Sequence, residues 1–241
     1  MVPWLVKARL KNKLLRARLG SRELPPAAAA NLEALDHLDP SRPAREFRYT
    51  FLDLETTGLN PDEDRVVSVG AVRMVGGRVR LGEVFSELVN PGRGIPVESI
   101  RIHGITPAQV AGARPAWEVF EDFLTWLGSD ILVAHYARFE LHFINYTMHR
   151  LYGFPLQNLV LDTVIMTERV VLPSDPYGIG RHKSERTLDS LARRFAISRA
   201  ARHTALGDAL LTAQLFQRML ALMRKKGPPT LAQLMRAARL D

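Results

Sequence analysis

The alternation of apolar and polar residues changes near residue 46, where a strand-like pattern begins. From residue 49 to residue 55, Tyr49, Phe51, Asp53 and Glu55 alternate with residues of the opposite face, which predicts a strand. Residues 66–75 and 79–89 predict two more strands, and the Gly76-Gly77 pair between them predicts a tight hairpin turn. Shorter apolar runs predict strands at 131–134 and 159–162.

Helical periodicity appears between and after these strands. It predicts helices over residues 117–127, 139–152, 188–195 and 204–223, of which the last is the longest and most regular. A hairpin followed by strands that alternate with helices is typical of an α/β protein with a mixed sheet flanked by helices. We expect this domain over residues 46–225, followed by a C-terminal helical tail over 226–241.

The first 45 residues follow a different pattern and predict a basic helical extension. A helix is expected over residues 4–19, with Leu10, Leu14 and Ala17 on one face, and a second short helix over 27–38. Pro40, Ser41 and Pro43 indicate a linker to the main domain.

Basic residues are concentrated in this extension. The chain has 33 Lys and Arg against 25 Asp and Glu, a net charge of +8. The first two dozen residues have only Glu23 to oppose their basic side chains, which are Lys7, Arg9, Lys11, Lys13, Arg16, Arg18 and Arg22. This asymmetry favours a polyanionic partner, nucleic acid first and an anionic membrane surface second. A protein partner, or a solvated helix with no partner, remains an alternative.

Composition limits the possible chemistry. The chain has no cysteine, so a metal site must use oxygen or imidazole ligands, which favour Mg²⁺ or Mn²⁺. No apolar run has the length of a transmembrane segment, and the N-terminus lacks the continuous apolar stretch of a signal peptide. We therefore expect a soluble, cytoplasmic protein.

Two acids interrupt the first predicted strand of the domain. Asp53 and Glu55 are two residues apart, so their side chains project from the same face. Two neighbouring carboxylates on a buried strand repel each other and lose hydration, and a divalent cation would make the arrangement favourable. The alternative is that the strand frays and water solvates both acids.

Two further segments carry candidate chemistry. Thr56, Thr57 and Gly58 follow the strand, where a tight turn would place hydroxyls and amides near a phosphate or a terminal hydroxyl. His203 precedes the longest predicted helix, and Asp208 lies near the start of that helix. Combined with the strand acids, these two residues suggest a general base and a metal ligand.

Taken in order, these residues resemble the motifs of the DEDDh exonucleases, and in particular the DnaQ-like branch that includes the proofreading epsilon subunit of bacterial DNA polymerase III. The similarity covers roughly residues 47–222. The matching segments are 53–59, 103–106, 133–139, the pair Asp162-Thr163, and His203 with Asp208 five residues later.

The resemblance implies a ribonuclease H-like sheet and a two-metal 3′→5′ exonuclease that acts on nucleic acid with a free 3′ end, with single-stranded DNA as the expected substrate. Asp53, Glu55 and Asp208 would hold one Mg²⁺ or Mn²⁺ ion, Asp53 and Glu140 would hold the other, and His203 would deprotonate the attacking water. The residues expected to contact substrate are Thr56, Thr57, Gly58, Leu59, His103, Ile105, His135 and Phe139. A DNA polymerase or another protein is a candidate partner for the N-terminal segment.

The second motif departs from the family pattern. Where the family usually has His-Asn-x-x-Phe-Asp, this chain has Tyr136 in place of asparagine and Glu140 in place of aspartate. The longer side chain of Glu140 moves the carboxylate by about a bond length, and positioning errors near 1 Å can cost on the order of 10²-fold in rate. The alternative function is therefore a catalytically weakened nucleic-acid-binding or adaptor module on the same fold.

Overall fold

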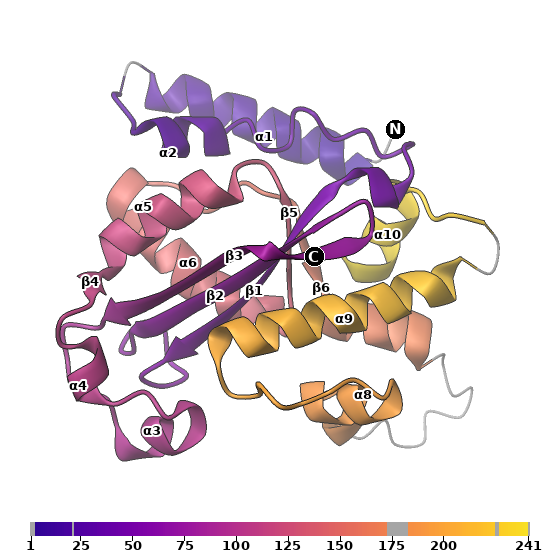
Figure 1. Ribbon diagram of the computed structural model, residues 1–241. Coiled ribbons are helices and arrows are strands. Elements are labelled where there is room, and N and C mark those ends of the chain that lie inside the picture. The colour runs from indigo at the N-terminus through magenta and orange to yellow at the C-terminus, as the bar shows by residue number, and fades with distance from the viewer. Residues whose placement is uncertain (1–2, 21, 173–182, 225–226, 241) are drawn as a thin grey trace.

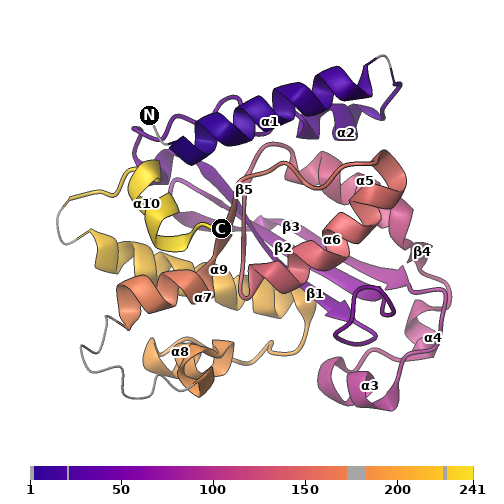
Figure 2. The same ribbon diagram turned by 180° about the vertical axis from the view of Figure 1, so that it is seen from behind.

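A six-stranded mixed sheet lies at the centre of the molecule, with helices on both faces (Figures 1 and 2). The computed structural model describes residues 3–20, 22–172, 183–224 and 227–240. The strands lie in the order β4-β3-β2-β1-β5-β6, with β1–β2 and β2–β3 antiparallel and β1–β5 and β5–β6 parallel. Their bounds are β1 Arg48–Thr56, β2 Val66–Val75, β3 Arg78–Asn90, β4 Arg114–Pro115, β5 Ile131–Ala134 and β6 Val160–Asp162. The expected α/β fold with a mixed sheet is confirmed.

The described helices surround this sheet. The α-helices are α1 Pro3–Leu19, α2 Pro26–Asn31, α3 Val97–His103, α4 Pro107–Val110, α5 Ala116–Leu127, α6 Ala137–Tyr152, α7 Thr163–Met166, α8 Leu188–Arg194, α9 Ala205–Met223 and α10 Leu231–Ala238. Short helical turns are η1 Ala44–Glu46, η2 Thr167–Val171 and η3 Lys183–Arg186. None of the helices that the structure describes has the length and apolar character needed to cross a membrane.

The alternation along β1 separates two apolar layers. Tyr49 and Phe51 face α9, where the ring of Phe216 lies 5.3 Å from each of their rings. Leu52 and Leu54 belong to the other layer, which packs against α5 and α6. Because side chains two residues apart share a face of a strand, Asp53 and Glu55 lie on the Tyr49 side, toward α9. The register of β1 therefore sets which helix completes the site.

The start of α9 approaches the sheet very closely. Gly70 of β2 is the register partner of Asp53 on β1. A Cβ atom at Gly70 would overlap the backbone of Ala205 and Leu206 at the first turn of α9. The missing side chain lets the helix N-terminus lie directly on the strand, next to the acids of β1.

The N-terminal extension packs onto the same core as the domain. Leu5, Leu35 and Leu38 are buried in the apolar cluster that contains Tyr49 and Phe216. The C-terminal segment also meets this region, because the amide of Ala44 donates to the Pro229 carbonyl at 2.8 Å. The division at residues 45 and 225 stays a prediction, although both flanking segments contribute to one packed structure.

The predicted second helix of the extension is too long. The helix α2 ends at Asn31, and turns follow through residue 37. The guanidinium of Arg16 donates to the Leu32 carbonyl, and that of Arg9 donates to the Leu35 carbonyl. These side chains from α1 satisfy backbone acceptors that a continuing helix would have used internally.

Candidate active site

Three carboxylates meet at the end of β1. Asp53 and Glu55 come from the strand, and Asp208 comes from the first turn of α9. One oxygen from each of these residues lies within 4.8 Å of the others. Asp208 is buried, and the two strand acids are half-buried. The structure thus brings together three of the four predicted metal ligands in a group that a single cation can bridge.

Glu140, the fourth acid, enters from the first turn of α6 and is buried. Its Oε2 atom has no hydrogen-bond partner among the described residues. Burial raises the pKa of Glu140 well above its usual range, and the charge of Glu55 raises it further. Glu140 also raises the pKa of Asp53, so it belongs to the same electrostatic group although it lies outside the tightest set of three.

Burial and neighbouring carboxylates raise the pKa values of the acids on β1. Burial, followed by the charges of Glu140, Asp208 and Glu55, raises the pKa of Asp53 well above its usual range. Burial and the charge of Asp208 raise the pKa of Glu55 to about 7. The Oδ1 atom of Asp208 is buried and has no hydrogen-bond partner among the residues that the structure describes. Hard carboxylate oxygens in a group of this kind fit divalent cations such as Mg²⁺ or Mn²⁺.

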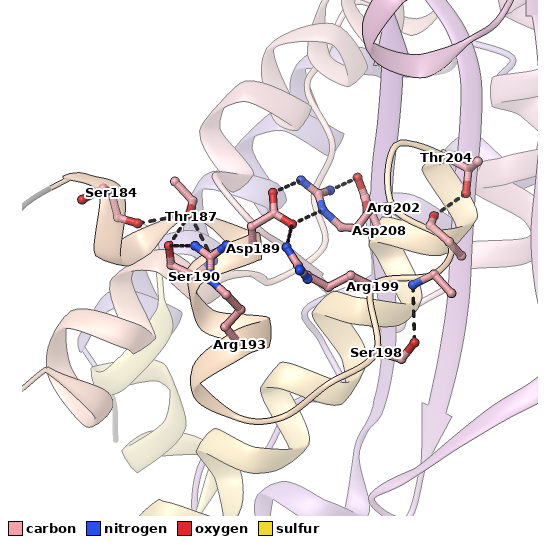
Figure 3. A network of polar contacts seen from close by, with 12 residues as sticks. Ser184, Thr187, Asp189, Ser190, Arg193, Ser198, Arg199, Arg202, Thr204 and Asp208 are labelled. Carbon is pink, nitrogen blue, oxygen red and sulfur yellow. Dashed lines mark hydrogen bonds and ion pairs between the residues drawn. The ribbon is translucent and has the colours of Figure 1, made fainter.

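Arg202 is the nearby cation that sequence reasoning missed. Its guanidinium pairs with Oδ2 of Asp208 and also with both carboxylate oxygens of Asp189 at 3.2 Å, as Figure 3 shows. These two carboxylates raise the pKa of Arg202 against the opposing effect of its partial burial. The sequence did offer one signal for this role: Arg202 directly precedes His203, in the segment that leads to Asp208.

His203 lies in the turn that leads into α9. Its backbone is left-handed, with φ of 64°, and its side chain is exposed. The next residue, Thr204, caps the helix by accepting a hydrogen bond from the Gly207 amide at 3.2 Å. The cap fixes where the helix starts and so fixes His203 relative to Asp208.

Asp162 is a buried acid with a structural role. Its carboxylate accepts hydrogen bonds from the amides of Ala137 at 3.0 Å and Val164 at 2.7 Å. These contacts join the end of β6 to the first turns of α6 and α7. Asp162 therefore holds the helix that carries Glu140, and burial raises its own pKa.

The turn after β1 is tightly bonded. The hydroxyl of Thr56 donates to the Gly58 carbonyl at 2.6 Å, and the hydroxyl of Thr57 donates to Asp64 at 2.9 Å. A side chain at Gly58 would overlap the carboxylate of Asp64. Leu59 is 82% exposed at the tip of this turn. The turn presents one apolar side chain to solvent beside the acids of β1.

His103 and Ile105 lie at the end of α3. His103 is buried, its Nδ1 accepts the Ile105 amide at 3.0 Å, and its Nε2 has no partner among the described residues. Burial lowers the pKa of His103. Ile105 packs partly against Val67 and Ile95. Both residues therefore shape the loop, and the nearby Ile102 is the more exposed apolar side chain.

His135 and Phe139 flank the N-terminus of α6. His135 is buried, with Nδ1 2.8 Å from the Thr163 hydroxyl, and burial lowers its pKa to about 4. Phe139 is half-buried against Phe143. Between them, Tyr136 lies at the N-cap position of α6 in a left-handed conformation with φ of 62°, with an exposed ring and no side-chain capping hydrogen bond. An asparagine adopts this conformation more readily, so the departure at this position has a backbone cost.

Comparison with known proteins identifies the family. A family model described as exonuclease matches residues 50–216. The chain belongs to the exonuclease family. It is also 35% identical over 173 residues to the DNA polymerase III subunit epsilon of Treponema pallidum, which covers 72% of this chain and 76% of that protein. The expected membership of the DnaQ-like, DEDDh group is confirmed.

A further relative is much longer than this exonuclease. The chain is 41% identical over 191 residues to a DNA polymerase III subunit epsilon-like protein of Rhodobacter capsulatus, and the match covers 78% of this chain but only 26% of that protein. The exonuclease therefore spans about a quarter of the length of that relative.

Solved structures share the fold. The nuclease domain of 3′hExo, a DEDDh family member bound to rAMP, superposes with a TM-score of 0.61 at 18% identity, covering 74% of this chain and 94% of that one. Exonuclease X in complex with 5′ overhanging duplex DNA gives a TM-score of 0.55 at 24% identity, covering 78% and 98%. These likenesses confirm the ribonuclease H-like architecture.

Proposed function

We propose that this exonuclease works in the 3′→5′ direction and releases nucleoside monophosphates from single-stranded DNA. The observation that carries the proposal is the group of four acids with raised pKa values or unpaired oxygens at the end of β1. The relatives named as epsilon subunits, and an exonuclease I structure that holds a dT13 oligonucleotide, support a DNA substrate.

Asp53, Glu55 and Asp208 are suited to hold one divalent cation. The family resemblance assigns a second ion to Asp53 and Glu140, and the charge of Glu140 acts on Asp53. When bound, two such ions supply positive charge that stabilises the attacking and leaving oxygens of an in-line displacement. Mg²⁺ or Mn²⁺ fits an all-carboxylate site. Glu140 enters from α6, outside the tight set of three, and this position would leave room for its extra methylene.

His203 is the proposed general base. Its imidazole is exposed next to the helix that carries Asp208, and an imidazole accepts a proton near neutral pH. His203 would take the proton of the attacking water and pass it to solvent. The left-handed turn and the Thr204 cap hold it in place for this step.

The turn after β1 and the start of α6 are the proposed seat of the 3′-terminal nucleotide. Leu59 would make an apolar contact with the terminal base, and Phe139 would stack on a neighbouring base, where aromatic stacking contributes ~1–3 kcal/mol per base. Thr56, Thr57 and Gly58 would present backbone groups to the terminal sugar or phosphate. Buried His103 and His135 support these walls through the hydrogen bonds described above.

The direct test is release of mononucleotides from a 3′-labelled single-stranded oligonucleotide with Mg²⁺, with Mn²⁺ and with EDTA. We expect metal-dependent release that Asp53→Ala abolishes, while Asp122→Ala, which changes an exposed acid on α5, leaves it intact. Absence of release with either metal from folded protein would contradict the proposal. Release of nucleotides from the 5′ end would contradict the proposed 3′→5′ direction but not the exonuclease activity.

Glu140 distinguishes the enzyme from a binding or adaptor module on the same fold. We expect Glu140→Gln to lower the rate by on the order of 10²-fold, because the site loses a carboxylate held in place by α6. An inert parent protein that becomes active on Glu140→Asp would establish the adaptor alternative instead. A DNA polymerase is the partner that the relatives' names suggest, and co-purification with its subunits would test that association.

A further inference from the structure

The basic residues of α1 fall into two groups with different surroundings. Arg9 and Arg16 turn inward and donate to backbone carbonyls of residues 32–38. Lys7, Lys11, Lys13 and Arg18 are exposed, and none of them forms an ion pair with a residue that the structure describes. Only the second group is available to a ligand.

Three of these cations, Lys7, Lys11 and Arg18, border a groove between α1 and the segment after α6. The groove has a volume of about 660 Å³, and residues 153–158 form its other wall. His149 at the end of α6 also lines the groove, and none of the described residues that line it is Asp or Glu. The lining therefore favours an anion.

A buried polar side chain lies in the floor of this groove. Asn12 lines it, is only 2% exposed, and its Nδ2 has no hydrogen-bond partner among the described residues. A buried amide donor without a partner is unfavourable, and most such groups in native proteins are paired. A phosphate oxygen in the groove would accept this hydrogen bond, as asparagine side chains commonly donate to nucleic-acid phosphates.

We propose that this groove, bounded by Lys7, Lys11 and Arg18 with Asn12 in its floor, binds the phosphodiester backbone of the substrate strand away from its 3′ end. Lys7 and Arg18 are eleven residues apart on α1, which is about 16 Å along a helix. A single phosphate cannot contact both, whereas a polynucleotide presents phosphates at intervals along such a row.

The location of the groove agrees with an anchoring role. In both views α1 lies across one end of the molecule, while α3, α8 and the start of α9 lie at the other (Figures 1 and 2). Asp53 and Glu55 lie near the C-terminal end of β1, and this end of the strand points away from α1 in both views. The inference rests on the proposed function, since a strand held here must be long enough to reach the acids. Short substrates would not use the groove.

The test measures binding without turnover. In EDTA and low salt, fluorescence anisotropy gives the Kd for a labelled single strand of about thirty nucleotides, a span of several site sizes. We expect the triple change Lys7→Gln, Lys11→Gln and Arg18→Gln to raise this Kd at least tenfold and to reduce the salt slope by about 2, because each phosphate contact on a single strand contributes about 0.7. Metal-dependent cleavage of a tetranucleotide should be unchanged.

A matched variant removes the same charge elsewhere. Lys13→Gln with Arg78→Gln and Arg80→Gln changes three exposed basic residues outside the groove, and we expect less than a threefold effect on Kd. Equal weakening by both triple variants would overturn the inference, because net charge alone would then explain binding. Unchanged oligonucleotide binding together with lost binding to vesicles of phosphatidylglycerol would also overturn it, in favour of a lipid surface. Cleavage of the tetranucleotide does not depend on the groove, so it tests the proposed function independently of both results.

Asn12→Leu tests the floor without changing charge. The leucine has a similar shape and removes the unpaired amide, so we expect an unchanged or higher Tm together with a Kd for the long strand raised at least threefold. A loss of affinity without loss of stability is the signature of a ligand contact. An unchanged Kd in a folded Asn12→Leu protein would contradict the assignment of Asn12.

Discussion

Arg202 balances charge at the site when no cation is bound. It pairs with Asp208 and is held by Asp189, and its side chain is half-buried between them. We expect Arg202→Gln to lower the free energy of unfolding in EDTA at pH 8 by about 3–5 kcal/mol, the usual cost of removing one partner of a buried ion pair. The loss should be smaller at pH 5, where Glu55, whose pKa is raised to about 7, is protonated and the site carries less negative charge. Mg²⁺ should restore part of it.

Chemical denaturation with and without Mg²⁺ at both pH values measures this effect. Arg199→Gln is the control, because Arg199 pairs with Asp189 at 3.4 Å but does not reach Asp208. We expect the control to change stability by less than about 1 kcal/mol, as for an exposed pair. Equal losses at pH 5 and pH 8 would show that Arg202 acts through packing rather than through charge.

Metal binding should compete with protons at Glu55. Its pKa in the folded chain is raised to about 7, so the native state binds more protons than the unfolded chain between the ordinary pKa of about 4.5 and that value. The free energy of unfolding in EDTA should therefore fall as the pH rises from about 4.5 through 7. Mg²⁺ affinity should change in the opposite sense, tightening by up to tenfold between pH 6 and pH 8.

Calorimetric titration of the folded protein with Mg²⁺ across this range checks the linkage. Glu55→Gln should bind Mg²⁺ more weakly and should flatten the pH dependence of stability in EDTA. An affinity that is the same at pH 6 and pH 8 would mean that the acids are already ionised at the lower pH.

At the residue scale, the sequence located the acids but not their charge balance. The spacing of Asp53 and Glu55 on one strand required them to share a face, and β1 bears this out. The pairing of Asp189 and Arg202 depends on how the loop before α9 folds back onto α8, which no local pattern records. The same packing determines which carboxylate oxygens of the site lack a hydrogen-bond partner among the described residues.

At the element scale, the site depends on how closely α9 lies on β2. Gly70 has no side chain to separate the strand from the backbone of Ala205. We expect Gly70→Ala to displace the start of α9, to lower stability by about 1–3 kcal/mol, and to reduce nucleotide release by on the order of 10²-fold, because Asp208 moves away from Asp53. Denaturation and single-turnover assays measure the two effects.

Gly82→Ala is the matched control for this helix–strand contact. Gly82 lies on β3 in the same sheet, and a Cβ atom there would meet nothing within 4 Å. We expect stability and activity close to those of the parent. Full activity of Gly70→Ala would show that α9 adjusts without moving its acid.

The long elements were predictable from sequence because their patterns are local. The Gly76-Gly77 turn and the strands on either side of it are confirmed, with both glycines in the left-handed region. The short elements β4, α3, α4 and α7 were missed, since two to seven residues carry too little periodicity to stand out. The extra first turn of α6 was also missed because the start depends on Tyr136 adopting a positive φ.

At the scale of the whole molecule, the basic extension is part of the folded unit. Arg9 and Arg16 fasten α1 to the turns after α2, and Leu5 joins the core cluster of the sheet. Removing the extension would therefore expose apolar surface that the domain needs to cover. Binding roles of α1 are better examined with surface substitutions than with truncation.

Leu5 and Leu10 of α1 allow a direct comparison between a residue that packs into the core and a residue on the outer surface of the same helix. Leu5 is 2% exposed in the core cluster, whereas Leu10 is 57% exposed on the outer face of the same helix. We expect Leu5→Ala to lower the free energy of unfolding by about 2–5 kcal/mol, as for a buried leucine, and Leu10→Ala to change it by less than about 0.5 kcal/mol. Denaturant titration of both variants measures the difference. Equal, small effects would mean that α1 is held to the domain by its arginines alone, and deletion of the extension would then leave a folded exonuclease.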